Sequence, residues 1–175
     1  MILRAVFGFI LGMFYIGLIA QGSRQHLVAD SSSVPRNTIY LEVLGAGGLG
    51  SLNYERIFLD KSRFMAGARI GVGSIHFTDF TRRFNPDLLF PAGVFLCYGK
   101  RIKAELAGGT TITSIVYPDP EDLKPARRSE IHGWAAIGMR YQRSANGLLL
   151  RLAYTPIIEF GVWRHWAGAS IGYAF

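Results

Sequence analysis

The sequence is poor in cysteine and in charge. Only one of its 175 residues is a cysteine, Cys97, and charged residues make up 18% of the chain, whereas soluble domains average about 25%. A single cysteine excludes a disulfide framework and a zinc site built from cysteines. Half of the residues are hydrophobic, so a disordered chain is excluded as well.

Long apolar runs are missing after the first 20 residues. The opening stretch "MILRAVFGFILGMFYIGLIAQGS" has one positive charge at Arg4, a long apolar core and small residues at Ala20 and Gly22. This layout predicts a secretory signal peptide over residues 1–20, cleaved after Ala20, and then a polar segment over residues 21–37. The alternative is a permanent membrane anchor, because the apolar stretch over residues 6–20 is close to spanning length.

A basic stripe is also missing, although the net charge is +7. The basic residues stand singly or in pairs, without the interleaved aromatic residues of a nucleic-acid surface. We therefore expect no nucleic-acid partner.

Helical periodicity is absent beyond about residue 37, and alternation with a period of two takes its place. In "TIYLEVLG", Ile39, Leu41 and Val43 face one way, while Tyr40 and Glu42 face the other. Similar alternation or strand composition predicts seven more strands, in "SLNYERIF", "FMAGARIGVGSIHF", "LFPAGVFLCY", "KAELAGGTTITS", "WAAIGMRYQ", "LLLRLAYT" and "WAGASIGYAF".

The connections between these strands predict an antiparallel up-and-down meander. Tight turns are expected at residues 59–62, 99–101 and 143–147, and long loops at residues 78–88 and 117–130. A short glycine turn at residues 47–50 and a short loop at residues 161–165 complete the series. In a meander, the tight turns and the long loops fall at opposite ends.

The direction in which the charged face points separates two barrel classes. A soluble, periplasmic, lipocalin-like carrier would bury Leu150 and Ile137 and expose Arg140 and Arg151, whereas a membrane barrel would do the reverse. Three features favour the membrane barrel: strands long enough to cross a bilayer, a glycine-rich charged face with both signs of charge, and aromatic residues at the strand ends. Those aromatic residues are Tyr98, Tyr141, Tyr154, Tyr173 and Phe175.

The stretches "LGAGGLGSLNYERIF", "GKRIKAELAGGTT" and "IGMRYQ" resemble small outer-membrane β-barrel proteins of Bacteroidota-type bacteria. The final "GASIGYAF" resembles the assembly signal of bacterial outer-membrane proteins, with Ser170 where that signal favours glycine. The resemblance covers roughly residues 38–175. It implies an all-β fold, an eight-stranded transmembrane barrel in the bacterial outer membrane, with outer-membrane lipids and the barrel-assembly machinery as partners.

The charged face predicts a closed lumen. An eight-stranded barrel is just wide enough to be filled by its own side chains. The residues expected to form a charge network in the lumen are Glu42, Glu55, Arg69, Glu105, Arg140 and Arg151. We interpret them as a structural plug, with a proton path or a gated ion site as the alternative.

Catalysis is the first alternative function, because small outer-membrane barrels include lipid A-modifying enzymes that use a histidine. His76, His132 and His165 are all expected near the outer rim, but their positions in the alternation place them on different faces. No His-x-Ser pair is present. We therefore predict no catalytic residue, no metal site and no cofactor, and an enzyme would need His76 or His132 within hydrogen-bond reach of a hydroxyl or carboxylate.

The two long loops hold the best binding candidates. Arginine side chains can bind phosphate in bidentate fashion, so the basic residues of these loops are predicted contacts for lipopolysaccharide phosphates: Arg82, Arg83, Lys124, Arg127 and Arg128. Nearby acidic residues allow the alternative of a solvated loop of mixed charge. The predicted function is a structural or surface-interaction role through these loops, with the ligand and the oligomeric state left open.

Overall fold

The computed structural model describes residues 35–120, 123–142, 147–159 and 162–175. The predicted signal peptide (residues 1–20), most of the polar segment over residues 21–37 and most of the predicted turn at residues 143–147 lie outside the described residues. Among the described residues, no helix is long and apolar enough to cross a membrane.

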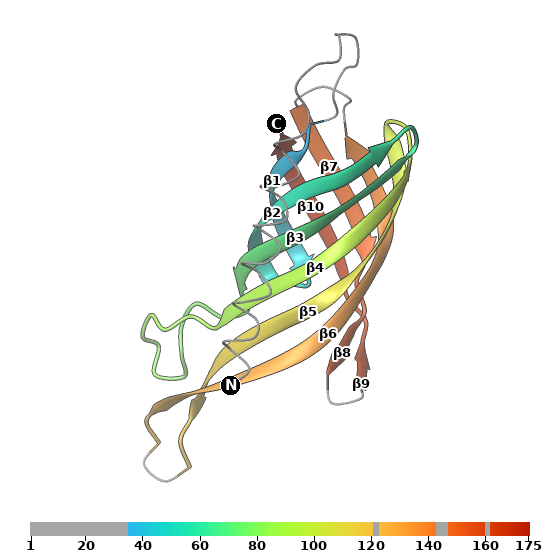
Figure 1. Cartoon of the computed structure of the whole chain (residues 1–175). Coiled ribbons are helices and arrows are strands. Elements are labelled where there is room, and N and C mark those ends of the chain that lie inside the picture. The colour runs from blue at the N-terminus through green and yellow to red at the C-terminus, as the bar shows by residue number, and fades with distance from the viewer. Residues whose placement is uncertain (1–34, 121–122, 143–146, 160–161) are drawn as a thin grey trace, which may run out of the picture. The chain divides into compact units, whose positions relative to one another are not determined.

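The described residues form one antiparallel sheet of ten strands that closes into a barrel (Figure 1). The strands are β1 (Asn37–Gly45), β2 (Gly48–Lys61), β3 (Phe64–Ser74), β4 (Leu88–Gly99), β5 (Ile102–Pro118), β6 (Pro125–Gln142), β7 (Gly147–Tyr154), β8 (Ile157–Glu159), β9 (Val162–Arg164) and β10 (Ala167–Ala174). Apart from the three-residue strands β8 and β9, eight strands make the wall, so the predicted eight-stranded up-and-down barrel is confirmed.

The barrel closes between β1 and β10, which pair from Thr38 opposite Ala174 to Val43 opposite Ala169. The backbone amide of Asn37 donates to the carbonyl of Phe175 at 3.0 Å, and the amide of Phe175 donates back to Asn37 at 2.8 Å. Strand β10 also pairs with β7 along its whole length. Both edges of the alternating C-terminal stretch are therefore hydrogen-bonded, which explains its apolar, aromatic pattern: it is a wall strand and not a surface tail.

The two ends of the barrel differ. At the tight-turn end, β2 and β3 are joined by residues 62–63 and β4 and β5 by residues 100–101. Ser62 adopts the left-handed conformation, with φ 54°, that such a turn needs. At the loop end lie the segment over residues 75–87, the tip of the β5–β6 hairpin, and the small hairpin of β8 and β9. The last of these replaces the short loop predicted at residues 161–165.

The predicted loop over residues 117–130 is wrong in its extent. Strands β5 and β6 continue past the wall as a hairpin whose last pair is Pro118 opposite Pro125, and only residues 119–124 connect them. The neighbouring strands stop earlier, because β4 begins opposite Ser114 and β8 pairs no further than Gly133. Proline has no amide hydrogen to donate to a ladder, which is why the pairing ends at the two prolines.

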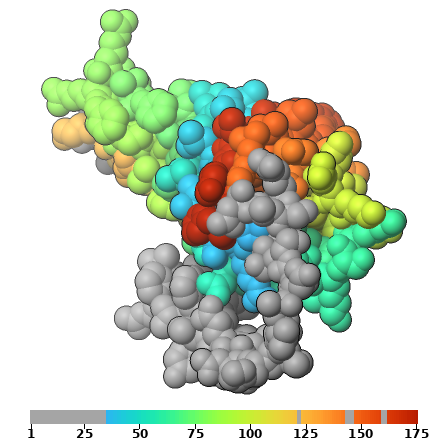
Figure 2. Space-filling view, turned by 90° about the horizontal axis from the view of Figure 1, so that it is seen from above, coloured from blue at the N-terminus to red at the C-terminus, as the bar shows by residue number. Residues whose placement is uncertain are grey.

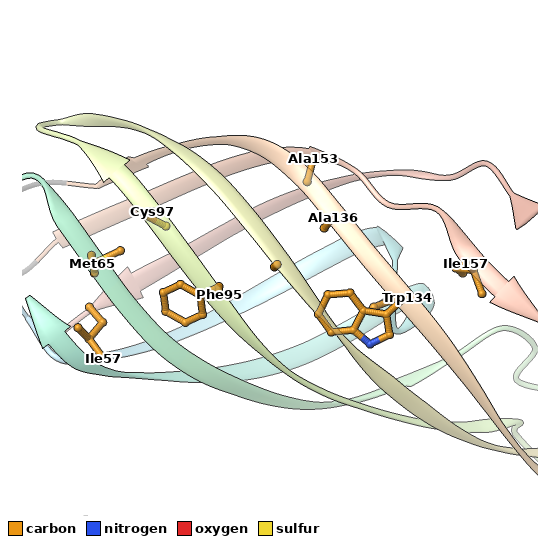
Figure 3. Close-up of a cluster of buried hydrophobic side chains, with 10 residues drawn as sticks. Ile57, Met65, Phe95, Cys97, Trp134, Ala136, Ala153 and Ile157 are labelled. Carbon is orange, nitrogen blue, oxygen red and sulfur yellow. The ribbon is translucent and has the colours of Figure 1, made fainter.

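The inside of the barrel combines apolar and charged side chains. A buried hydrophobic cluster includes Met65, Phe95 and Cys97 near the tight-turn end and Trp134 and Ile157 toward the loop end (Figure 3). The Trp134 ring occupies space that two glycines leave, since a Cβ on Gly93 or Gly109 would lie within 2.8 Å of its indole carbons. The glycine-rich inner face therefore lets large side chains fill the lumen.

Candidate functional site

The most organised group of side chains lies in the lumen. The six residues predicted there come from β1, β2, β3, β5, β6 and β7, and the structure brings all of them together. Each is no more than 6% exposed. We call these six residues the lumen network: Glu42, Glu55, Arg69, Glu105, Arg140 and Arg151.

Glu105 is the centre of the lumen network. Its carboxylate oxygens lie 2.9 Å from Arg140 Nε, 2.8 Å from Arg151 Nε and 3.4 Å from Arg69 Nη1. These arginines project from three other strands, and β3 and β7 are not neighbours of β5 in the sheet. The contacts from β3 and β7 therefore cross the lumen and tie the wall together from the inside.

The other two glutamates complete the pairing. Arg140 Nη2 donates to Glu55 Oε2 at 2.6 Å, and Arg151 Nη1 donates to Glu42 Oε1 at 2.6 Å. Three arginines and three glutamates leave the lumen network with no net charge. An unpaired buried charge would be expensive, and this pairing offsets the loss of hydration.

Two aromatic rings of the lumen support the arginines. The guanidinium carbon of Arg69 lies 4.5 Å from the centre of the Trp134 ring, and that of Arg140 lies 4.7 Å from the centre of the Phe95 ring. Cations in this position are attracted to the negative face of the ring. Arg69 and Arg140 are thus both paired with glutamates and covered by a ring, an arrangement suited to a plug.

The outer face of the barrel is apolar. Ile137 is 61% exposed, although Arg140 on the same strand is fully buried. Leu150 is likewise exposed while Arg151 is buried. This is the reverse of the facing that a lipocalin-like carrier requires, so the interpretation as a soluble ligand carrier is wrong. The further outward apolar side chains of the wall include Ile39, Leu41, Val43, Leu52, Ile70, Val72, Val94, Leu96, Leu106, Met139, Leu148, Leu152 and Ile171.

Aromatic residues flank this apolar belt. Tyr98, Tyr141 and Tyr173 are exposed near the tight-turn end, and Tyr154 is exposed at the loop end. An apolar band with aromatic residues at its borders is the surface that a membrane barrel presents to lipid. The barrel wall is therefore built to be surrounded by lipid.

The basic residues predicted to bind phosphate have different surroundings at the loop end. Arg82 and Arg83 are exposed in the β3–β4 segment, and Lys124 precedes β6. Arg127 and Arg128 lie within β6 and not in a loop. The Arg128 Nε atom forms an ion pair of 2.8 Å with Glu130.

Arg127 connects the two projections of the loop end. Its guanidinium donates to the side-chain oxygen of Asn85, to the carbonyl oxygen of Pro86 at 3.0 Å, and to the hydroxyl of Ser114 at 3.4 Å. The β3–β4 segment is thereby attached to the β5–β6 hairpin. Sequence reasoning missed this contact, because nothing in the order of residues pairs position 127 with position 85.

The histidines do not converge. His76 Nδ1 lies 3.0 Å from Asp87 Oδ2 at the base of the β3–β4 segment, whereas the ring of His165 stacks on Tyr154. His132 lies on β6. Among the described residues, no group of three or more histidine, cysteine or acidic side chains is placed to hold a metal ion.

An enzyme at this rim would need His76 or His132 within hydrogen-bond reach of a hydroxyl or carboxylate, and His76 has such a contact with the carboxylate of Asp87. Asp87 is buried, and its second oxygen accepts a hydrogen bond of 2.9 Å from the amide of Val116 on β5. The nearby Ser74 hydroxyl donates to the carbonyl oxygen of His76 at 2.9 Å. The serine hydroxyl is therefore engaged by the backbone in this arrangement, while the carboxylate orients the imidazole.

Comparison with known proteins adds the fold class. No protein-family model matches the chain. No curated protein matches its sequence. Among solved structures, the N-terminal β-barrel domain of Pseudomonas aeruginosa OprF is similar, with a TM-score of 0.55 and 11% identity over 80% of this chain and 96% of that one. The Yersinia pestis outer membrane protein Ail has a TM-score of 0.49 and 9% identity, over 81% of this chain and 99% of that one.

The fold of the OprF domain and the outward apolar belt agree with each other. A closed antiparallel barrel with a polar interior and an apolar outer band is the architecture of transmembrane β-barrels, and the OprF domain shares the barrel fold at 11% identity. The chain therefore has the fold and the outward apolar belt of a transmembrane β-barrel. The predicted transmembrane barrel fold is confirmed, whereas the predicted cleavage of a signal peptide falls on residues outside those described.

Proposed function

We propose that the protein acts at the cell surface as a closed barrel, without conducting solutes, and that the loop end carries its interactions. The observation that supports this most is the lumen network, in which every charge has a partner of opposite sign. If this arginine and glutamate cluster fills the lumen and carries no net charge, solutes do not pass through the barrel. The protein would then act through its outer surface. Its partners would be outer-membrane lipids, and the barrel-assembly machinery would insert it.

The contact between the β3–β4 segment and the β5–β6 hairpin supports an interaction surface at the loop end. Arg127 holds the β3–β4 segment against the β5–β6 hairpin, so the two would move as one platform. A platform held in one shape binds with a smaller loss of conformational entropy than two separate loops. We also propose that the chain belongs to the small Bacteroidota-type barrel proteins, a proposal supported by the stretches "GKRIKAELAGGTT" and "IGMRYQ".

Cysteine labelling in whole cells tests the orientation. Cys97 is changed to serine, single cysteines are placed at Lys124 and, separately, at Leu150, and a charged maleimide that does not cross membranes is added. We expect labelling at Lys124 and protection at Leu150, which faces lipid. Labelling of Lys124 only after the outer membrane is permeabilised would overturn the proposal.

A second candidate function, lipid A modification, is favoured by the contact of His76 with Asp87. The carboxylate would hold the imidazole in one orientation, as the acidic member of a catalytic triad does. Mass spectrometry of lipid A from cells with the wild-type protein or with His76→Ala tests it. Loss of an acyl chain that depends on His76 would establish the enzyme, and identical lipid A in both strains would exclude this histidine as its base.

A further inference from the structure

The β3–β4 segment ends in a compact, amphipathic tip formed by residues 77–84. Three phenylalanines expose their rings there: Phe77 is 62%, Phe80 49% and Phe84 79% exposed. Exposed aromatic rings so close together are unusual on a surface that faces only water, and they mark a place of contact. The sequence by itself predicts only the arginines of this segment, and not its phenylalanines, as binding residues.

The tip is ordered by one carboxylate. Asp79 accepts hydrogen bonds from the Thr81 hydroxyl at 2.6 Å, the Thr81 amide at 2.8 Å and the Arg83 amide at 3.1 Å. The Asp79 amide donates to the Arg83 carbonyl at 3.0 Å, and Thr78 and Phe84 form a bridge below. The exposed rings are thus held outward by a closed turn.

The charge of the tip is positive on its accessible side. Arg82 and Arg83 are exposed, and among the described residues no carboxylate is within ion-pair distance of either guanidinium. The carboxylate of Asp79 is occupied by donors from within the tip. Of the five basic residues predicted to bind phosphate, these two have their guanidiniums available, whereas Arg127 and Arg128 are engaged by other residues of the chain.

The tip also lies to the side of the barrel. Figure 2, turned by 90° from Figure 1, shows the green β3–β4 segment standing out beyond the wall, next to the orange end of the β5–β6 hairpin. The wall below it is part of the apolar belt, with Val72 on β3 and Phe90 on β4 exposed. A segment that leaves a lipid-facing wall sideways extends over the lipid around the barrel.

From these observations we propose that the tip docks on the phosphorylated headgroups of the outer-leaflet lipids around its own barrel. Arg82 and Arg83 contact the phosphates, for which guanidinium groups are suited in shape and charge. Phe77, Phe80 and Phe84 enter the boundary between headgroups and acyl chains, where their rings lose contact with water. This inference rests on the proposed function, because it requires the loop end to face the outside of the cell.

Site-directed fluorescence quenching in vesicles tests the docking. The full-length barrel carries Cys97→Ser and a single cysteine at Phe84, labelled with a fluorophore, and is placed in phosphatidylcholine or in an equal mixture of phosphatidylcholine and phosphatidic acid. Quenching by a lipid with a spin label near its headgroup is compared with quenching by iodide in water. Leu123→Cys is the matched control, because Leu123 is 71% exposed at the tip of the neighbouring hairpin.

We expect the fluorophore at position 84 to be quenched by the lipid label, more strongly with phosphatidic acid, and the one at position 123 by iodide. The double change Arg82→Gln and Arg83→Gln should weaken the preference for phosphatidic acid by about fivefold per arginine, the effect of one basic side chain near an anionic surface. Arg128→Gln should leave it unchanged. A second labelling site at Phe80 guards against a local effect of the Phe84 change, and heat-dependent gel mobility confirms that each variant is folded.

Equal access of iodide to positions 84 and 123 in both lipids would overturn the docking, and would direct attention to a soluble partner for the exposed rings. Lipid quenching of the same strength with and without phosphatidic acid, and with and without the two arginine changes, would overturn the role of phosphate. Either failure, together with labelling of Lys124 in intact cells, would leave the proposed function standing. Labelling of Lys124 only in permeabilised cells would remove the proposed function itself.

Discussion

Two of the three arginine–glutamate ion pairs that strand β6 forms among the described residues have nearly equal lengths but lie in different surroundings. Arg140 Nε lies 2.9 Å from Glu105 inside the lumen, and Arg128 Nε lies 2.8 Å from Glu130 on the hairpin beyond the wall. The Arg140 side chain is fully buried, while that of Arg128 is 68% exposed. The distance alone therefore does not determine how much an ion pair contributes to the free energy of unfolding. The surroundings matter as well, because water competes for the exposed pair and not for the buried one.

The same comparison holds for apolar residues on the outer face. Ile137 and Ile131 lie on β6 in the same phase of the alternation and are exposed to similar extents. Ile137 belongs to the wall, whereas Ile131 lies on the hairpin past the last pairing with β8. One faces lipid and the other lies at its border, so one strand passes through both environments.

Removing the charge at the centre of the lumen network should have the largest effect. Glu105→Gln leaves three buried arginines with two glutamates, and we expect it to lower the free energy of unfolding by about 3–5 kcal/mol. Urea unfolding in phosphatidylcholine vesicles, followed by tryptophan fluorescence, measures it. The matched change Glu130→Gln should cost about 0–1 kcal/mol, and equal effects of the two changes would contradict the difference between the pairs.

Placing a charge on the lipid-facing wall should have the next largest effect. Ile137→Arg is expected to lower the free energy of unfolding by about 2–4 kcal/mol, because arginine is costly in the middle of the bilayer, and Ile131→Arg by about 0–1 kcal/mol near its border. The same unfolding experiment separates them. A tolerated arginine at position 137 would argue that lipid does not surround the wall.

Detaching the β3–β4 segment should have a smaller and local effect. Arg127→Gln removes contacts to Asn85 and Pro86, and we expect the segment to open more easily by about 1 kcal/mol, since its hydrogen bonds are exposed to water. Hydrogen exchange of the amides of residues 75–87 measures this opening. Arg128→Gln, one residue away, should leave those rates unchanged; a similar rise in both variants would rule out the specific role of Arg127.

The smallest predicted effect concerns the turn in the tip. The hydrogen bond from the Thr81 hydroxyl, with help from the Arg83 amide and the Asn85 side chain, lowers the pKa of Asp79 below its usual value. A carboxylate with a lowered pKa in the folded state stabilises the turn above its unfolded pKa, and this stabilisation is lost as the pH falls through the lowered value. Thr81→Ala should therefore raise the pKa of Asp79 and open the turn at a higher pH. Carboxyl titration followed by NMR would show this shift, and an unchanged titration would refute the role of Thr81.

Most of the fold follows from the alternation of apolar and polar residues along the sequence. The buried charges of the wall alternate with outward apolar residues, as in Arg140 beside Met139, and a closed barrel with an apolar exterior follows from that pattern. The contacts between the charges do not follow from it. Glu105 meets Arg69 and Arg151 across the lumen, and such contacts depend on the stagger of strands that only the closed barrel defines.

The loop end was harder to predict, because its sequence is ambiguous. The charged residues and prolines over residues 117–130 suggest a loop. Residues 115–118 nevertheless pair with residues 125–128 and extend the hairpin. Pairing of a strand with its neighbour overrides the local preference of its residues. The attachment by Arg127 and the pairing of His76 with Asp87 depend on the path of the β3–β4 segment and leave no pattern in the sequence.

The measurement that tests the closed lumen most directly is the conductance of planar bilayers containing the folded barrel. The paired charges and the rings of Trp134 and Phe95 fill the lumen, so we predict no stepwise current from the wild-type protein. Stable, ion-selective current steps that appear only with the folded barrel would contradict the account, because they would show that the lumen network is a conducting path and not a plug.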